Sequence, residues 1–315
     1  MIVYILRKIC TFLLILLILA QISFAIVYCL PGTAFYNLTF FHAYFTFFNE
    51  LLSGTIRLSP HSSLSLLQTL KQILPITIEL CIFTILFSLI IGVPLGIIGG
   101  LNTNKWQNKA LQSFCLIIGA SPLVWIAVLS LFIFFPHLPN EGSFIEQTNP
   151  ITGFPLIDIL LTPGIDTAQE LWKEFTYLVL PVVILSIQPC ILAIQLLSQN
   201  IEKIAKQNYI KTAIIREQSQ LKILWRHLLP NALPPVIPQL THGFTILLFS
   251  TMVVEIVFDR YGLGKWVMHG FETKNGVIIA VAILVCGLLI GAFNLLSEIF
   301  ILVIHPLRHK ELYDK

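Results

Sequence analysis

The sequence predicts an all-α membrane protein with six transmembrane helices. Hydrophobic residues make up 56% of its 315 residues and charged residues only 11%, whereas soluble domains contain about 25% charged residues. Six apolar runs approach or exceed the length of about 20 helical residues that crosses a bilayer. These observations exclude an ordinary soluble domain, and a net charge of +3 gives no sign of a nucleic-acid partner.

The apolar runs define the expected domains. The first helix belongs to a segment 1–30, which we interpret as an uncleaved signal anchor although Ser23-Phe24-Ala25 resembles a signal-peptidase site. An external loop, 31–72, and a core with five helices, 73–315, follow. The six runs cover residues 9–30, 74–99, 111–135, 178–197, 236–258 and 277–304.

The distribution of basic residues predicts the orientation. Of the 19 lysines and arginines, 13 lie in the amino end, the 101–109 loop, the 198–235 loop and the carboxyl tail. Because basic residues concentrate in cytoplasmic loops, we expect both termini and the 198–235 loop to be cytoplasmic. The chain is then a multi-pass protein of the cytoplasmic (inner) membrane, in contact with lipid.

Two runs carry signals for helix packing and bending. Gly92, Gly96 and Gly100 recur every four residues, a spacing that lets a second helix approach closely. Pro94 suggests a kink in the same run, and Gly119-Ala-Ser-Pro122 suggests one in the third. The aromatic residues of 31–72 are either interfacial anchors or a binding face.

Acidic residues near the ends of the runs are functional candidates, because charge at membrane depth is costly. We expect Glu79 to reach the interface, and Glu298 to face a water-filled cavity or a partner helix. For Glu255 a place in a pathway or external gate, hydration, and pairing with Arg260 all remain open. The pathway and gate candidates are Glu255, Gly243, Gly262 and Gly264.

The 198–235 loop is basic and has the pattern of a helix, a turn and a second helix. Ser219 can cap the second helix, and Pro230 and Pro234 are expected to end it because each lacks a backbone donor. Such a segment is either a solvated basic loop or a docking surface for a soluble partner. The second helix places Leu221, Leu224, Trp225 and Leu228 on one predicted face, and Lys222 and Arg226 on another.

Motifs of enzymes and cofactor sites are missing from the sequence. The six cysteines lie in or beside apolar runs without C-x-x-C spacing, so we expect small buried residues rather than disulfides or a metal site. Gly262-Leu-Gly-Lys265 is not a phosphate-binding loop, and neither H-E-x-x-H nor G-x-S-x-G occurs. We therefore expect no catalytic residues, no metal and no cofactor.

With these residues laid out, the chain resembles the permease subunits of ABC importers for oligopeptides, dipeptides and nickel, and most of all the first, B-type, oligopeptide subunit. The resemblance runs along nearly the whole chain. Its motifs are Leu6-Arg-Lys8, Leu30-Pro31-Gly32, Leu74-Pro-Ile-Thr77-Ile-Glu79, Gly92-Val-Pro-Leu-Gly96, Ser121-Pro122, Leu138-Pro139-Asn-Glu-Gly142, Leu180-Pro181, Tyr209-Ile-Lys-Thr212-Ala213, Arg226-His227, Asn231-Ala232-Leu233, Val253-Val-Glu255-Ile-Val-Phe258 and Tyr261-Gly262-Leu-Gly264.

The resemblance implies a transport subunit without chemistry of its own that moves oligopeptides or dipeptides. Its implied partners are a second homologous permease, two cytoplasmic ATPase subunits that hydrolyse ATP, and an external substrate-binding protein. It also implies that the 209–235 stretch docks on the ATPase. The coupling residues it indicates are Tyr209, Thr212, Ala213, Glu217, Leu221, Trp225, Arg226, His227, Asn231 and Pro235.

The chain departs from the family pattern at three places. Glu217 stands where a turn glycine is expected, Pro31-Gly-Thr-Ala34 replaces Pro-Gly-Asp-Pro, and His305-Pro-Leu-Arg308 replaces the Asp-Pro-Arg of the tail. These changes affect the expected turn geometry and the fit to an ATPase, while the six-helix plan is unaffected.

Three alternatives are weighed against a peptide permease. A permease for nickel or another small solute has the same architecture. An ATP-independent secondary transporter predicts inverted repeats or ionisable residues at mid-membrane, and the sequence shows neither. A membrane-embedded enzyme predicts a convergent set of catalytic residues, and the cysteines and histidines form none.

Overall fold

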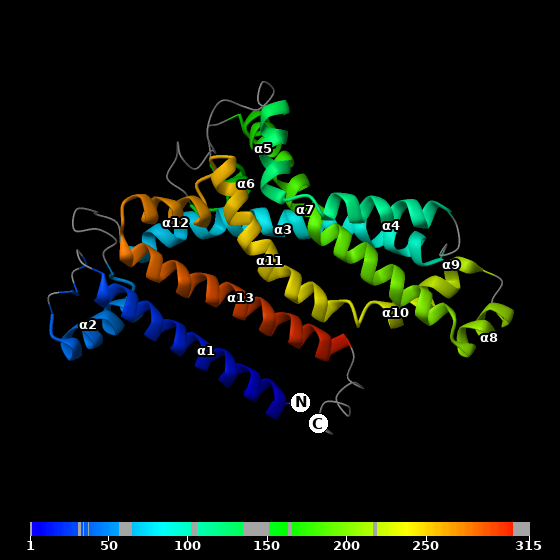
Figure 1. Ribbon diagram of the computed structural model, residues 1–315, viewed down its shortest axis with the longest axis horizontal. Helices are drawn as coiled ribbons and strands as arrows, with labels where there is room; N and C mark the ends of the chain where they lie inside the picture. Colours follow the sequence, from blue (N-terminus) through cyan, green and yellow to red (C-terminus); the bar gives the residue numbers. More distant parts are fainter. Residues whose placement is uncertain are drawn as a thin grey trace.

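The computed structural model describes residues 2–30, 33, 35–36, 38–56, 65–101, 106–134, 151–162, 166–216 and 219–304. Helices dominate these ranges (Figure 1). In chain order they are α1 (Ile2–Cys29), α2 (Phe40–Ser53), α3 (Leu66–Leu101), α4 (Trp106–Gly119), α5 (Leu123–Phe134), α6 (Pro155–Leu161), α7 (Thr167–Ala205), α8 (Asn208–Arg216), α9 (Gln220–Ile223), a π-helical turn (Leu224–Leu228), α10 (Leu229–Ala232), α11 (Ile237–Val257), α12 (Leu263–Glu272) and α13 (Gly276–Ile304).

Every predicted apolar run overlaps a helix, and the all-α fold class is confirmed. In the described residues four helices, α1, α3, α7 and α13, are long and apolar enough to cross a bilayer. The pair α4 and α5 provides a fifth span if it is counted as one, and α11 contributes a shorter apolar stretch, His242–Val257. Six spans therefore remain a prediction, while four or five follow from helix length and composition.

The third run is a broken helix rather than a kinked one. Its two halves, α4 and α5, meet at an angle of 88°. Pro122 lies at the break and lacks a backbone donor, so the hydrogen-bond ladder of α4 cannot continue through it. The Gly119-Ala-Ser-Pro122 signature predicted the position of the bend, and only its size exceeds the expectation.

The glycine spacing in α3 has the predicted effect, and the helix that approaches is α7. A Cβ atom on Gly96 would lie 3.0 Å from the Cβ of Leu197, and one on Gly100 would lie 2.7 Å from the Cβ of Ile201. Both distances are shorter than an ordinary carbon–carbon contact of about 3.5–4.0 Å. The small residues therefore let the backbones of α3 and α7 pack closely.

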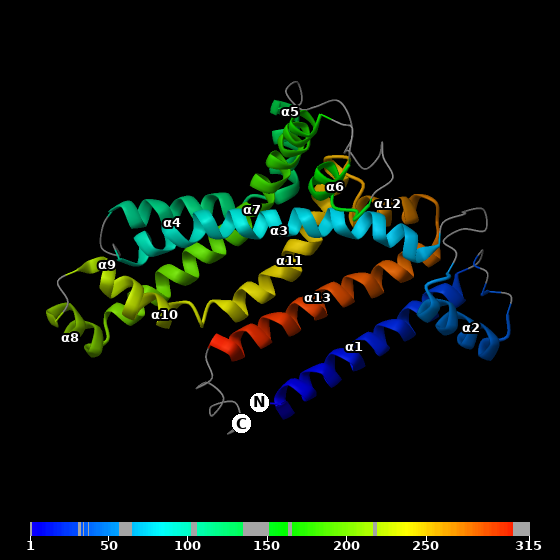
Figure 2. The ribbon, with the colours of Figure 1, turned by 180° about the vertical axis from the view of Figure 1, so that it is seen from behind.

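Helices α1 and α13 lie side by side and antiparallel (Figures 1 and 2). The Lys8 Nζ atom lies 2.6 Å from Oε1 of Glu298, so the predicted partner helix of Glu298 is α1. On α13, Gly291 leaves room for the ring of Phe12 and Gly287 for the side chain of Leu19. The first helix is thus packed on the rest of the bundle.

Helix α2 was not predicted, and it divides the aromatic residues of the second segment. Phe47 is buried and its ring centroid lies 5.7 Å from that of Phe24 on α1, whereas Phe41 and Phe45 are exposed. The interior rings attach α2 to α1. For the exposed rings, interfacial anchors and a binding face both remain predictions.

The cysteines are all free, but their burial was only partly predicted correctly. Cys81, Cys115 and Cys286 are buried and Cys190 is half-buried, whereas Cys10 and Cys29 are exposed on α1. The exposed pair lies on a helix with much of its apolar surface outside the protein core.

Candidate functional site

Helices α8, α9 and α10 and the π-helical turn form one folded unit at the end of α7, which we call the coupling segment (residues 208–236). Figures 1 and 2 place it at the opposite end of the molecule from α12. Ile210, Ile223 and Leu228 are buried in a cluster that also contains Ile201 and Ile204 of α7. Because the unit has an apolar core shared with α7, it is a folded module rather than an irregular loop. Docking of a soluble partner on its exposed face stays a prediction.

The predicted apolar face of the second helix is divided between core and solvent. Leu224 and Leu228 are buried, but Leu221 and Trp225 are 69% and 70% exposed. Residues Leu224–Leu228 form a π-helical turn, which does not keep the 3.6-residue spacing on which the prediction was based. The two exposed side chains extend from a segment that their buried neighbours anchor. Pro230 does not end this segment, since α10 (Leu229–Ala232) follows the π-helical turn directly and has Pro230 in its first turn, where the missing N–H is tolerated.

Two of the predicted coupling residues bond within their own helices, and the whole set differs in exposure to solvent. Thr212 and Asn231 bond within their own helices, since the Thr212 hydroxyl donates to the Asn208 carbonyl at 3.1 Å and the Asn231 amide donates to the His227 carbonyl at 2.8 Å. The exposed residues of the set are Tyr209, Thr212, Leu221, Trp225, Arg226 and Asn231. The half-buried ones are Ala213, His227 and Pro235. Glu217 lies outside the described residues.

Sequence reasoning missed two features of the coupling segment. Ile215 is highly exposed on α8, which adds a further exposed apolar side chain to Leu221 and Trp225. The Asn200 amide on α7 donates to the Ala232 carbonyl at 3.3 Å and ties α10 to the long helix. A polar residue within a helix gives no sequence signal for a contact of this range.

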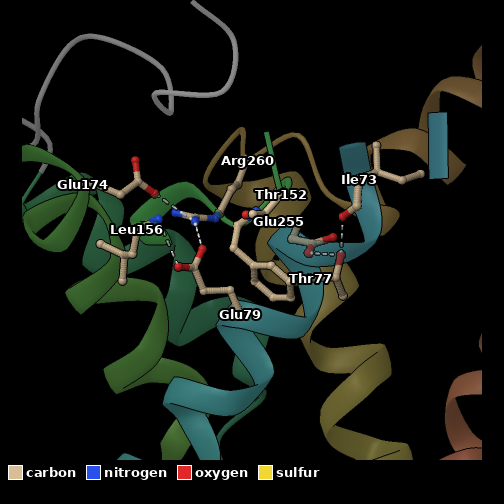
Figure 3. A network of polar contacts seen from close by, with 9 residues as sticks. Ile73, Thr77, Glu79, Thr152, Leu156, Glu174, Glu255 and Arg260 are labelled. Carbon is tan, nitrogen blue, oxygen red and sulfur yellow. Dashed lines mark hydrogen bonds and ion pairs between the residues drawn. The ribbon is translucent and has the colours of Figure 1, made fainter. Parts of the chain in front are cut away.

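At the opposite end, Glu255 is fully buried and binds the start of α12. Figure 3 shows it beside Thr77 of α3. Its Oε2 atom accepts a hydrogen bond from the backbone N–H of Gly264 at 2.6 Å, and its Oε1 atom accepts one from the Thr77 hydroxyl at 2.7 Å. The Leu263 N–H donates to the same hydroxyl oxygen at 2.8 Å. A carboxylate is favourable here, because helix N-termini carry unpaired N–H groups and a partial positive charge.

Gly262 and Gly264 provide the space that this arrangement needs. A Cβ atom on Gly262 would overlap the Glu255 carboxylate, and one on Gly264 would overlap the backbone of Met252. Three of the four pathway and gate candidates therefore meet in one buried cluster. Gly243 lies elsewhere, in the wall of a pocket of about 110 Å³ between α7 and α11.

Arg260 is 1% exposed and forms a second buried cluster with two acids (Figure 3). Its Nη2 atom lies 3.0 Å from Oε1 of Glu174 and 3.6 Å from Oε2 of Glu79. Arg260 forms its ion pairs with these two acids and not with Glu255, so the alternative that pairs Glu255 with Arg260 is wrong. The backbone N–H of Arg260 donates to the Glu255 carbonyl at 2.8 Å. Glu79 is buried and accepts from the Leu156 N–H at 3.3 Å, so the expectation that it reaches the interface is also wrong.

These contacts join α3, α6, α7 and the α11–α12 connection at one end of the bundle. Glu174 was missed, because its only sequence signal is an acidic residue near the start of a long helix. Among the residues that the structure describes, no three His, Cys, Asp or Glu side chains are grouped as a metal site would require.

The comparisons with known proteins agree with this architecture. The family described as "Binding-protein-dependent transport system inner membrane component" matches residues 92–310. The putrescine export system permease protein SapB of Escherichia coli (strain K12) is 34% identical over 99% of both chains. The peptide transport system permease protein SapB of Salmonella typhimurium is 33% identical over the same share, and the dipeptide transport system permease protein DppB of Escherichia coli (strain K12) is 21% identical over 83% of this chain and 79% of its own. The chain therefore belongs to the family of binding-protein-dependent transport system inner membrane components and is a multi-pass permease subunit of the inner membrane.

Proposed function

We propose that this permease moves oligopeptides or dipeptides across the inner membrane as part of an ATP-driven importer. Two cytoplasmic ATPase subunits hydrolyse the ATP and dock on residues 209–235. A second homologous permease completes the pathway, and an external binding protein delivers the substrate. Relatives named for peptide and dipeptide transport support the choice of substrate.

The docking proposal rests on one observation. Apolar side chains of the coupling segment are exposed to solvent, while a buried apolar core anchors the same segment. Trp225, Leu221 and Ile215 are exposed at the end of the bundle, while Leu224 and Leu228 anchor the same segment to α7. Exposed tryptophan and leucine side chains provide contact area for a soluble partner. Arg226 and Lys222 are exposed beside them and favour encounter and orientation.

The proposal includes an orientation. With the coupling segment in the cytoplasm, α12 and the Glu255 cluster lie on the external side. The amino end of α1 and the carboxyl end of α13, joined by Lys8 and Glu298, then also face the cytoplasm. We retain the division into a signal anchor (1–30), an external segment (31–72) and a permease core (73–315) as part of this proposal.

A second candidate is the transport of a polyamine. The relative named for putrescine export is 34% identical to this chain along its whole length, and proteins with nearly the same identity are named for peptide transport. Putrescine is a dication and a peptide is a polyamide. The two substrates therefore need different groups in the pathway.

The docking proposal is tested by co-purification of the chain with its ATPase subunits. We expect Trp225→Glu combined with Arg226→Glu to abolish the complex, because two acidic groups would replace an apolar contact and a cation. Trp172→Glu is the matched control, since Trp172 is also 70% exposed but lies on the first turns of α7, away from the coupling segment. All variants are first checked for equal amounts in the membrane.

Retention of the ATPase by the Trp225 and Arg226 variant would contradict the docking surface. Purification of the wild-type chain alone, together with solute movement in proteoliposomes that depends on an ion gradient and not on ATP, would contradict the whole proposal. That outcome would favour a secondary transporter.

A further inference from the structure

The pocket between α7 and α11 has two polar side chains in a lining that is otherwise apolar. Gln188 of α7 and Ser250 of α11 belong to its lining, which is otherwise made of Leu, Ile, Pro and Gly residues. In the described part of the chain no side-chain hydrogen bond of Ser250 is found. Polar side chains are costly in the membrane unless they have a partner or face a polar cavity.

A proline interrupts the backbone hydrogen-bond ladder of α7 at the same wall. Pro189 stands inside α7 and lines the pocket together with Leu185. Because proline has no N–H, the Leu185 carbonyl lacks the donor that the helix would otherwise supply four residues later. An unpaired carbonyl at membrane depth is tolerated where the backbone borders a polar or water-filled space.

The pocket also adjoins the break between α4 and α5. The Gln188 amide donates to the carbonyl of Gly119, the last residue of α4, at 3.3 Å. Gln188 thus reaches from the pocket wall to a carbonyl freed by the 88° break. Substrate sites in membrane transporters are commonly built beside such discontinuous helices, where freed backbone groups are available.

The polar groups of this lining are uncharged, and the acids of the neighbouring helices have other partners. Glu255 binds Thr77 and the Gly264 N–H, Glu174 pairs with Arg260, and Glu298 pairs with Lys8. A diamine would be recognised by carboxylates. An amide and a hydroxyl match the donors and acceptors of peptide bonds.

We propose that this pocket is a substrate subsite of the translocation pathway, in which Gln188 and Ser250 bind the backbone amides of a peptide. The inference rests on the proposed peptide transport and assigns it a position and a chemistry. Leu192, Ile246 and Leu247 supply apolar surface for small side chains. Gly243 keeps the pocket open, because a Cβ atom there would lie 3.1 Å from Cδ2 of Leu192.

The test uses the full transporter, with its second permease, ATPase and binding-protein subunits, in proteoliposomes. The probe is a tripeptide of alanine, photo-leucine and alanine, and the labelled residues are mapped by mass spectrometry after illumination during ATP hydrolysis. We expect labelling of α7 and α11 around Gln188 and Ser250. Gln188→Leu and Ser250→Ala should each lower the labelling yield about three- to tenfold, the effect of losing one hydrogen bond.

Gln195→Leu is the matched control, since Gln195 lies on the same helix and is not part of the pocket lining. Ser250→Ala separates binding from fold, because the Ser250 side chain makes no hydrogen bond within the described part of the chain. Labelling elsewhere, or an unchanged yield in Ser250→Ala, would overturn the subsite. Loss of labelling in excess putrescine would overturn its assignment to peptides.

Failure of the proposed function is recognised separately, in the wild-type complex. If that complex shows neither tripeptide uptake nor tripeptide-stimulated ATP hydrolysis, the proposal of peptide transport is wrong, and so is the subsite that rests on it. If uptake is normal but the pocket is unlabelled, only the subsite is wrong.

Discussion

The carboxylate of Glu255, in the last turn of α11, accepts a 2.6 Å hydrogen bond from the backbone N–H of Gly264, in the first turn of α12. The intervening residues, Phe258 to Gly262, form a tight connection with backbone hydrogen bonds of its own. The buried carboxylate thus fixes where α12 begins and in which direction it runs.

Replacing Glu255 with glutamine should destabilise this connection. The glutamine oxygen can accept one of the two hydrogen bonds, but its NH₂ group would face either the Gly264 N–H or the Thr77 hydroxyl. We expect a loss of about 1–3 kcal/mol in the free energy of unfolding, typical of a buried donor left unpaired. Thermal unfolding of the detergent-solubilised chain measures it. Glu272→Gln, at the exposed end of α12, should change stability little, and equal effects at both positions would argue against the role of Glu255.

Replacing Gly264 with alanine should be more damaging. The new Cβ atom would overlap the backbone of Met252, which cannot move away as a flexible side chain can. We expect the variant to be largely absent from the membrane fraction on immunoblots. Gly119→Ala serves as the control, because a Cβ atom there would lie 3.4 Å from the nearest atom, Cδ1 of Ile191. Normal accumulation of the Gly264 variant would show that α12 is placed differently.

Replacing Arg260 alone should lower the stability of the protein more than replacing Arg260, Glu79 and Glu174 together. Arg260→Met leaves Glu79 and Glu174 buried without their cation, which costs about 3–5 kcal/mol. In the described residues the Arg260 Nε and Nη1 atoms have no hydrogen-bond partner, so the cluster is incompletely satisfied. Arg260→Met combined with Glu79→Gln and Glu174→Gln should therefore recover part of the lost stability. Melting temperatures compare the variants, and a triple variant no more stable than the single one would contradict this explanation.

Replacing Gly100 with alanine should loosen the contact between α3 and α7. The added Cβ atom would lie 2.9 Å from the Ser198 carbonyl oxygen and 2.7 Å from the Cβ of Ile201, so the two helices must separate. We expect a cost of about 1–3 kcal/mol, as for other overpacked sites. Cysteine pairs introduced across the two helices would report the change as slower disulfide formation, and an unchanged rate would refute the close approach.

Local patterns in the sequence were sufficient to predict the helices and some of their packing surfaces. Apolar runs longer than 20 residues predicted the principal helices, because a helix in lipid must satisfy its backbone internally and present apolar side chains. The spacing of Gly92, Gly96 and Gly100 predicted a close helix contact, and the motif at Gly119 predicted a bend. The family resemblance, which draws on the order of motifs along the chain, indicated the permease fold.

The partners of the buried charges were decided by the tertiary structure. Arg260 pairs with Glu79 and Glu174, from α3 and α7, although Glu255 is much nearer in sequence. The division of the coupling segment into a buried face and an exposed one also departed from the helical pattern at the π-helical turn. Helical periodicity depends on residues that are close together in the sequence, so it can be predicted from the sequence. A charge pair or a pocket depends on which distant helices come to lie together, and packing of the whole bundle determines that.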